Sequence, residues 1–284
     1  MTSAPSRAQL ENPRSAYRAL ELRATLACVA VLLGLAGVAW WSTVRAAGDM
    51  DDMPLGLGAV GTAMMPFDMA AGVFLLMWLT MMVAMMLPTV APVVLLHRMV
   101  MRRAGSGPQA TVAFGLGYLA VWAAAGVVPL LALVAFRQAA DGAGWVAPVS
   151  GLVLVGAGAY QFTAWKRTCQ RACQSPLTFL ATHDFGRGSA GAFRTGVSHG
   201  AWCLGCCWAL MAVLFVVGLM NLVWMAAISL VFLLEKHTTG RLVAWTAGAV
   251  VVAVGVAVLV DPAALEWLTG SGSDPAPLEQ MDGM

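Results

Sequence analysis

Long apolar runs decide what this sequence can fold into. Crossing a bilayer as a helix takes about 17–25 predominantly apolar residues. Seven runs come close to or exceed that length, and they cover residues 22–41, 69–96, 110–136, 145–165, 195–218, 220–235 and 241–260. The sixth is short and follows the fifth so closely that the two are expected to form a tight helical hairpin. The sequence therefore predicts an all-α, polytopic membrane helix bundle of about seven transmembrane helices.

The composition excludes several other classes of protein. The chain is 60% hydrophobic and only 11% charged, whereas a soluble domain is about a quarter charged and under half apolar. A formal net charge of +2 gives no strong field that would attract nucleic acid or another acidic partner. The expected surroundings are a lipid bilayer, and no nucleic-acid partner is expected.

The placement of the charges predicts an orientation. Loops on the cytoplasmic side of membrane proteins carry an excess of Lys and Arg. With the N-terminus inside, fourteen of the sixteen basic residues fall on the cytoplasmic side and ten of the fourteen acidic residues fall outside. Only Arg45 and Arg137 are basic residues on the outer side. We therefore expect seven spans with the N-terminus in and the C-terminus out, in a bacterial inner (cytoplasmic) membrane.

This topology divides the chain into three parts. Residues 1–21 form a cytoplasmic tail, 22–260 form the membrane domain, and 261–284 form a flexible acidic tail outside. Within the membrane domain, 42–68 is an outer loop and 166–194 is a cytoplasmic loop that contains two cysteines.

Cysteine is the first residue type whose positions suggest a functional site. Cys28 stands alone in the first run, and the other five cysteines lie in or near the cytoplasmic side. A reducing compartment disfavours structural disulfides and favours metal binding or redox work. At 100° per residue, four soft or borderline ligands fall within an arc of about 100° on the fifth run. They are His199, Cys203, Cys206 and Cys207, and Met211 continues the arc one turn further. The alternative is that cysteines serve as small packing residues.

A second pair of cysteines, Cys169-x-x-x-Cys173, follows the fourth run. If a helix continues there, the two thiols share a face. They could then chelate a soft metal or complete a site that begins on the fifth run. Neighbouring basic residues such as Lys166 favour thiolates, although they equally suit a role as topological stop-transfer charges.

Methionine is concentrated as strongly as cysteine. Twelve of the eighteen methionines lie between residues 50 and 101. In the second run, Met77, Met81 and Met85 form a stripe at helical spacing. Thioethers are ligands for Cu(I), whereas flexible apolar packing is their other common role. We expect Met81 and Met85 to line a metal route, with packing as the alternative.

At these residues the chain resembles a bacterial family known as predicted metal-binding integral membrane proteins. The matching elements are Trp78-x-x-Met81-x-x-Ala84-Met85-Met86-x-Pro88, Cys169-x-x-x-Cys173, Gly196-x-x-x-Gly200-x-x-Cys203-x-Gly205-Cys206-Cys207-Trp208-x-Leu210-Met211, and Glu235-Lys236. The likeness covers roughly residues 70–260. It implies a membrane location and metal binding, and it names neither a metal nor a reaction.

Together these features predict an integral membrane protein that handles or transports a soft metal, with Cu(I) favoured and zinc second. The expected primary ligands are His199, Cys203, Cys206 and Cys207, with Met211 beyond them, Cys169 and Cys173 as an exit or second site, and Met81 and Met85 along the route. Two alternatives stay open. One is a membrane thiol–disulfide oxidoreductase that uses the cysteine pairs. The other is a non-catalytic assembly partner of another metalloprotein, working with a metallochaperone or membrane partner. No catalytic residues are expected.

Overall fold

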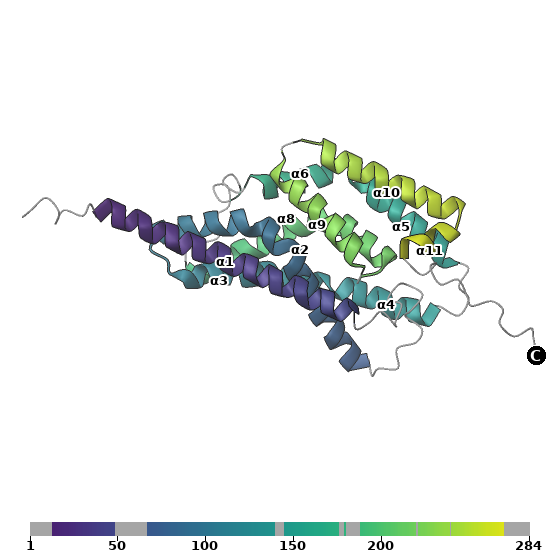
Figure 1. Ribbon diagram of the computed structural model, residues 1–284, viewed down its shortest axis with the longest axis horizontal. Helices are drawn as coiled ribbons and strands as arrows, with labels where there is room; N and C mark the ends of the chain where they lie inside the picture. Colours follow the sequence, from purple (N-terminus) through teal and green to yellow (C-terminus); the bar gives the residue numbers. More distant parts are fainter. Residues whose placement is uncertain are drawn as a thin grey trace, which may run out of the picture.

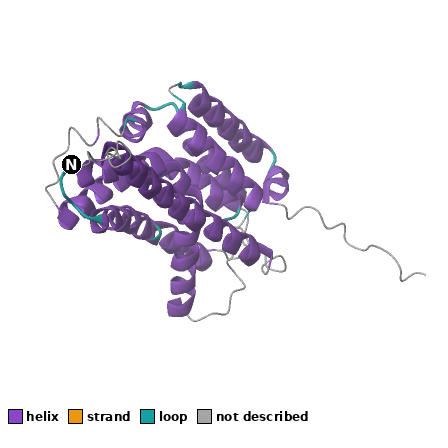
Figure 2. Ribbon diagram, turned by 60° about the vertical axis from the view of Figure 1, so that its left-hand side comes forward, coloured by secondary structure: helices purple, strands orange, loops and turns teal. Residues whose placement is uncertain are grey.

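The described part of the chain is almost entirely helical. A computed structural model describes residues 13–48, 67–139, 145–175, 179, 188–219, 221–238 and 240–269. No strand occurs in these ranges, and Figure 2 shows only helices joined by loops. The predicted all-α class is confirmed. The predictions for most of the outer loop and for the last residues of the acidic tail fall outside the described residues.

The helices form an elongated bundle in which α1 runs along one side and α10 along another (Figure 1). In chain order they are α1 (Pro13–Gly48), α2 (Phe67–Arg103), α3 (Pro108–Ala125), α4 (Val127–Ala139), α5 (Val146–Tyr160), α6 (Ala164–Gln174), α8 (Gly188–Val217), α9 (Leu222–His237), α10 (Leu242–Val260) and α11 (Ala263–Thr269).

Five helical stretches within the described ranges are long and apolar enough to cross a membrane. They are Glu21–Gly48, Ala71–Arg103, Pro108–Ala132, Gly188–Val217 and Leu242–Val260. A sixth span results if α5 and α6, which meet at 61°, are taken together. The helix α9 has only 16 residues, so it is shorter than these spans. The chain is therefore a multi-pass membrane protein with five to six candidate spans.

The bend between α5 and α6 places a short polar-faced helix beside the bundle. The hydroxyl of Thr163 accepts a hydrogen bond from the backbone N–H of Lys166 at 3.2 Å, so a new helix begins at this cap. The buried face of α6 carries Lys166, Cys169, Gln170 and Cys173. The two cysteines of the predicted pair therefore do share a helical face, on a separate helix rather than on a continuation of α5.

The helix α8 lies at the centre of the bundle. It packs on α3 over the most extensive helix–helix contact, and it also contacts α5, α6, α9 and α11. Small residues allow this approach, because a Cβ at Gly196 would overlap the carbonyl of Phe114 and one at Gly117 would overlap the carbonyl of Phe193. Such small-residue contacts let membrane helices pack at close backbone distance. They bring the side chains of α3 against the cysteine face of α8.

The predicted hairpin between the fifth and sixth runs is confirmed as the α8–α9 turn. Gly218 has φ of +104°, a conformation that only glycine adopts without strain. The side chain of Asn221 then accepts a hydrogen bond from the backbone N–H of Trp224 at 3.2 Å and caps α9. This turn returns the chain so that the end of α9 lies beside the cysteines of α8.

Candidate metal centre

The sulfur-rich face of α8 is fully enclosed. Cys203, Cys206 and Cys207 are each no more than 2% exposed, and all are free thiols. The Cys206 Sγ lies 3.3 Å from the Cys207 Sγ and 3.1 Å from the carbonyl oxygen of Cys203. The hydroxyl of Tyr118, on α3, lies 3.2 Å from the Cys203 Sγ. The face that carries the cysteines is therefore turned into the protein, where lipid does not reach it.

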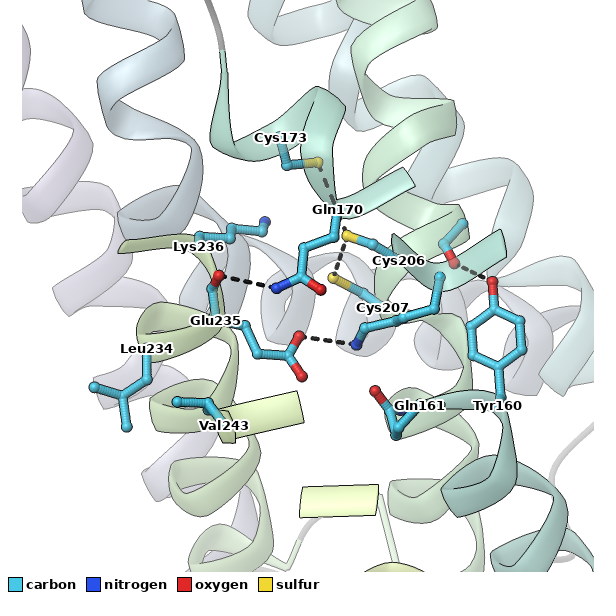
Figure 3. Close-up of polar contacts among 12 residues, drawn as sticks. Tyr160, Gln161, Gln170, Cys173, Cys206, Cys207, Leu234, Glu235, Lys236 and Val243 are labelled. Carbon is cyan, nitrogen blue, oxygen red and sulfur yellow. Dashed lines mark hydrogen bonds and ion pairs between the residues drawn. The ribbon is translucent and has the colours of Figure 1, made fainter. Parts of the chain in front are cut away.

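A cysteine from a second helix, α6, completes a compact group of thiols. The Sγ of Cys173, on α6, lies 3.8 Å from the Cys206 Sγ, as Figure 3 shows. The sulfur atoms of Cys173, Cys203 and Cys206 all lie within 4.8 Å of one another, and each residue is buried. We call these three residues the thiol triad. They are close enough for one metal ion to contact all three.

Lys236 supplies a positive charge next to the triad. This residue lies in the last turn of α9. Its Nζ donates to the Cys203 Sγ at 3.2 Å and to the Thr89 Oγ1 at 2.9 Å. Thr89 lies on α2, one turn after Met86, and its hydroxyl donates to the Met86 carbonyl at 2.8 Å. An ammonium beside a thiol favours the thiolate, which is the form that binds metals. Lys236 also links the methionine-rich helix to the triad.

The neighbouring residue, Glu235, holds α6 in place. Its carboxylate pairs with the Lys166 Nζ at 2.8 Å, and both side chains are buried. Its backbone carbonyl accepts hydrogen bonds from Gln170 Nε2 at 3.0 Å and from Gln174 Nε2 at 2.6 Å. The Gln170 contact is drawn in Figure 3. These bonds fix the helix that carries Cys173, so they indirectly position the triad.

The matching family agrees with this chemistry. A family model with the description "Copper chaperone", PpoB2, matches residues 75–258, which is well over half of the chain. The chain belongs to the PpoB2 copper chaperone family. No curated protein and no solved structure matches it. The matched region of this copper chaperone family member contains the thiol triad, Lys236 and the part of α2 that carries the buried methionines.

The structure places the other predicted sulfur ligands around the triad rather than in it. Cys207 lies against Cys206, and Met211, 5% exposed, follows one turn further along α8. Cys169 is buried beside Gly205, where an added Cβ would lie 2.7 Å from its Sγ. The predicted Cys169–Cys173 pair is therefore divided, since Cys173 joins the triad and Cys169 does not.

The predicted ligands on α2 and the histidine of α8 are also buried. Met81 and Met85 are each 1% exposed and belong to the same apolar core as the triad. His199 is 1% exposed and lies among aromatic rings, with centroids of Phe114 at 6.1 Å, Tyr118 at 6.2 Å and Phe179 at 5.2 Å. It lies one helical turn before Cys203 and is separate from the triad.

Two residues that contact the triad, Lys236 and Tyr118, were not expected from the sequence. In the sequence Lys236 is part of the Glu235–Lys236 element of the family resemblance, and the position of its Nζ depends on the α8–α9 hairpin. Tyr118 is one aromatic residue in an apolar run, and nothing in its neighbourhood marks it. Outside the triad, His97 is also fully buried, because α2 extends to Arg103 and Phe114 of α3 stacks on the imidazole.

Proposed function

We propose that this chain binds Cu(I) through the thiols of Cys173, Cys203 and Cys206 and passes it to an acceptor metalloprotein. The observation that carries the proposal is the thiol triad, three buried sulfurs within 4.8 Å of one another in a member of a copper chaperone family. Soft thiolate and thioether ligands select Cu(I). The adjacent ammonium of Lys236 offsets part of the negative charge that a thiolate site accumulates.

Zinc is the second choice of metal. Structural zinc sites are almost always four-coordinate, whereas the triad offers three thiols in one compact group. Cys207 is a fourth sulfur, and its contact is with Cys206. We assign it to the exchange of copper on and off the triad.

The remaining sulfur ligands form a route to the triad. Met81 and Met85 lie in the apolar core on α2, and the hydrogen-bonded link from Thr89 through Lys236 to Cys203 connects this helix to the thiols. Met211 extends the sulfur-lined face on α8, and Cys169 offers a further thiol on α6. Thioethers hold Cu(I) without adding charge to the interior, which suits a path through a membrane protein.

We also propose seven spans in a bacterial inner membrane, with the N-terminus inside and the C-terminus outside. The helix α9 is the sixth crossing in chain order, and it brings the total to seven. Its 16 residues reach about 24 Å at the helical rise of about 1.5 Å per residue. A bilayer adapts to such a short helix by local thinning. The domain limits are those of the sequence prediction, with the membrane domain at residues 22–260 between two tails.

Fusions to a reporter that is active only outside the cytoplasm test this topology. A reporter fused after Asp141 or near the C-terminus should be active, and one fused after Arg102 should be inactive. Activity after Arg102, or a silent C-terminal fusion at normal abundance, would contradict it.

Copper loading of purified full-length protein tests the function. Cys173→Ser, Cys203→Ser and Cys206→Ser should each lower bound Cu(I) at least tenfold, because a hydroxyl is a poor substitute for a thiolate toward Cu(I). Cys28→Ser is the matched control, since Cys28 lies on α1 and outside the triad, and it should load normally. Equal loading in all four variants would refute the site. Metal-free protein with a reversible disulfide would favour the thiol oxidoreductase instead.

A further inference from the structure

Two buried histidines have unused donor atoms. His97 is 0% exposed, and neither of its ring nitrogens has a hydrogen-bond partner among the described residues. His199 is 1% exposed, and its Nδ1 likewise has no partner in that part of the chain. Buried polar groups are normally hydrogen-bonded, and an exception calls for an explanation such as an ion that binds there. Both exceptions lie in one group of packed rings that reaches the thiol site.

Aromatic rings connect these histidines to the triad. The ring of Phe114 is stacked on His97 with centroids 4.6 Å apart, and its centroid lies 6.1 Å from that of His199. The ring of Tyr118 is stacked on His199 at 6.2 Å, and its hydroxyl reaches the Cys203 Sγ at 3.2 Å. A continuous series of side chains therefore runs from Cys203 to His97.

The series leads toward one end of the bundle. His97 lies near the end of α2 at Arg103, and His199 lies in the half of α8 that begins at Gly188. Packing alone does not require an imidazole at either place, because a phenylalanine or leucine would fill such space without leaving a buried nitrogen unsatisfied. Neutral imidazole nitrogens are ligands for copper. The neutral imidazole is the form that binds a metal.

We propose that His199 and His97 are transient nitrogen ligands on the path by which Cu(I) moves between the thiol triad and this end of the bundle. In each step a Cu–S or Cu–N bond breaks as a new Cu–N bond forms. Copper stays Cu(I), and no electron is transferred. The thiolate left at Cys203 remains beside the ammonium of Lys236, which neutralises it. This inference rests on the proposed function, and it adds two residues and a direction of exit.

Release of copper tests it. Full-length protein loaded with one equivalent of Cu(I) is mixed with excess bathocuproine disulfonate, and the appearance of the coloured complex is followed in time. His97→Leu should hold as much copper as the wild type and release it at least tenfold more slowly. His97→Met has a similar volume and restores a soft ligand, so it should recover most of the rate. His237→Leu is the matched control, because that imidazole is exposed and, within the described ranges, its hydrogen bond is to Leu233 of its own helix. Its rate should be unchanged.

The same experiment separates this inference from the function it rests on. Equal release rates for His97→Leu and the wild type, or equally slow release for His97→Leu and His97→Met, would overturn the histidine path and leave the triad intact. If Cys203→Ser still bound a full equivalent of copper, the proposed function would itself fail. The nitrogen contribution in the copper X-ray absorption spectrum during release gives a second readout, which should fall in His97→Leu.

Discussion

The helices α1 and α8 have similar apolar character and very different surroundings. Both qualify as membrane spans, yet only 11% of the apolar segment of α1 is buried inside the protein, against 61% of that of α8. Each carries cysteine, with a half-buried Cys28 on α1 and three fully buried cysteines on α8. Hydropathy therefore identifies both helices as membrane segments, and it does not distinguish the helix that faces lipid from the one that builds a site. That distinction depends on small residues and on what packs against them.

Replacing a glycine by valine should destabilise the protein very differently in the two helices, and this is the largest effect we expect. Gly196→Val on α8 should abolish accumulation of folded protein, because the new side chain meets the backbone of Phe114. We expect a loss on the order of 4 kcal/mol or more, as in severe overpacking. Gly37→Val on α1 should be nearly neutral, since nothing lies within 4 Å of its Cβ position. Membrane abundance and thermal unfolding in detergent measure both. Equal tolerance of the two changes would show that α8 does not pack on α3 as described.

The buried ion pair should have the next largest effect. Lys166→Met leaves the Glu235 carboxylate buried without its partner, which costs about 3–5 kcal/mol when such a pair is broken. Replacing both partners, as in Lys166→Met with Glu235→Leu, should recover much of the stability, because no charge is then left unpaired. Thermal unfolding and copper loading report the result. A double variant no more stable than the single one would show that the pair does not hold α6.

The methionines of α2 should have the smallest effect on stability. Met81→Leu with Met85→Leu keeps approximate volume and hydrophobicity, and such swaps usually cost less than about 1.5 kcal/mol. Folding should survive, whereas copper flux should fall, because leucine has no lone pair to offer a metal. Unchanged flux at normal abundance would show that these methionines only pack the core. The copper path would then consist of cysteine and histidine ligands.

Much of the fold could be predicted from the sequence, because apolar length and charge placement are local signals. All seven runs form helices, although 110–136 is divided at Gly126 and 145–165 is interrupted at residues 161–163. The α8–α9 hairpin was expected. The shared buried face of Cys203, Cys206 and Cys207 followed from the helical period. The bend that separates α6 from α5 was not foreseen, because it depends on the cap at Thr163 and on the contacts of α6 with α9.

The spacing of residues along the sequence does not predict which side chains form the triad. His199 lies on the same arc as Cys203, so the helical spacing predicts both residues as ligands. The third thiol instead comes from Cys173 on another helix. The pairing of Lys166 with Glu235 and the hydrogen bonds of Gln170 and Gln174 bring that helix into place. The different positions of Cys169 and Cys173 also depend on tertiary packing. The Cys169 thiol faces Gly205, whereas the Cys173 thiol faces Cys206.

X-ray absorption at the copper edge of the loaded full-length protein tests the thiol triad most directly. At rest, the spectrum should show Cu(I) surrounded by sulfur, with three thiolates as its nearest neighbours. Cys206→Ser should lose this shell together with its copper, and Cys28→Ser should reproduce the wild-type spectrum. A first shell of nitrogen and oxygen in the wild type, or an unaltered sulfur shell in Cys206→Ser, would contradict copper binding at the triad.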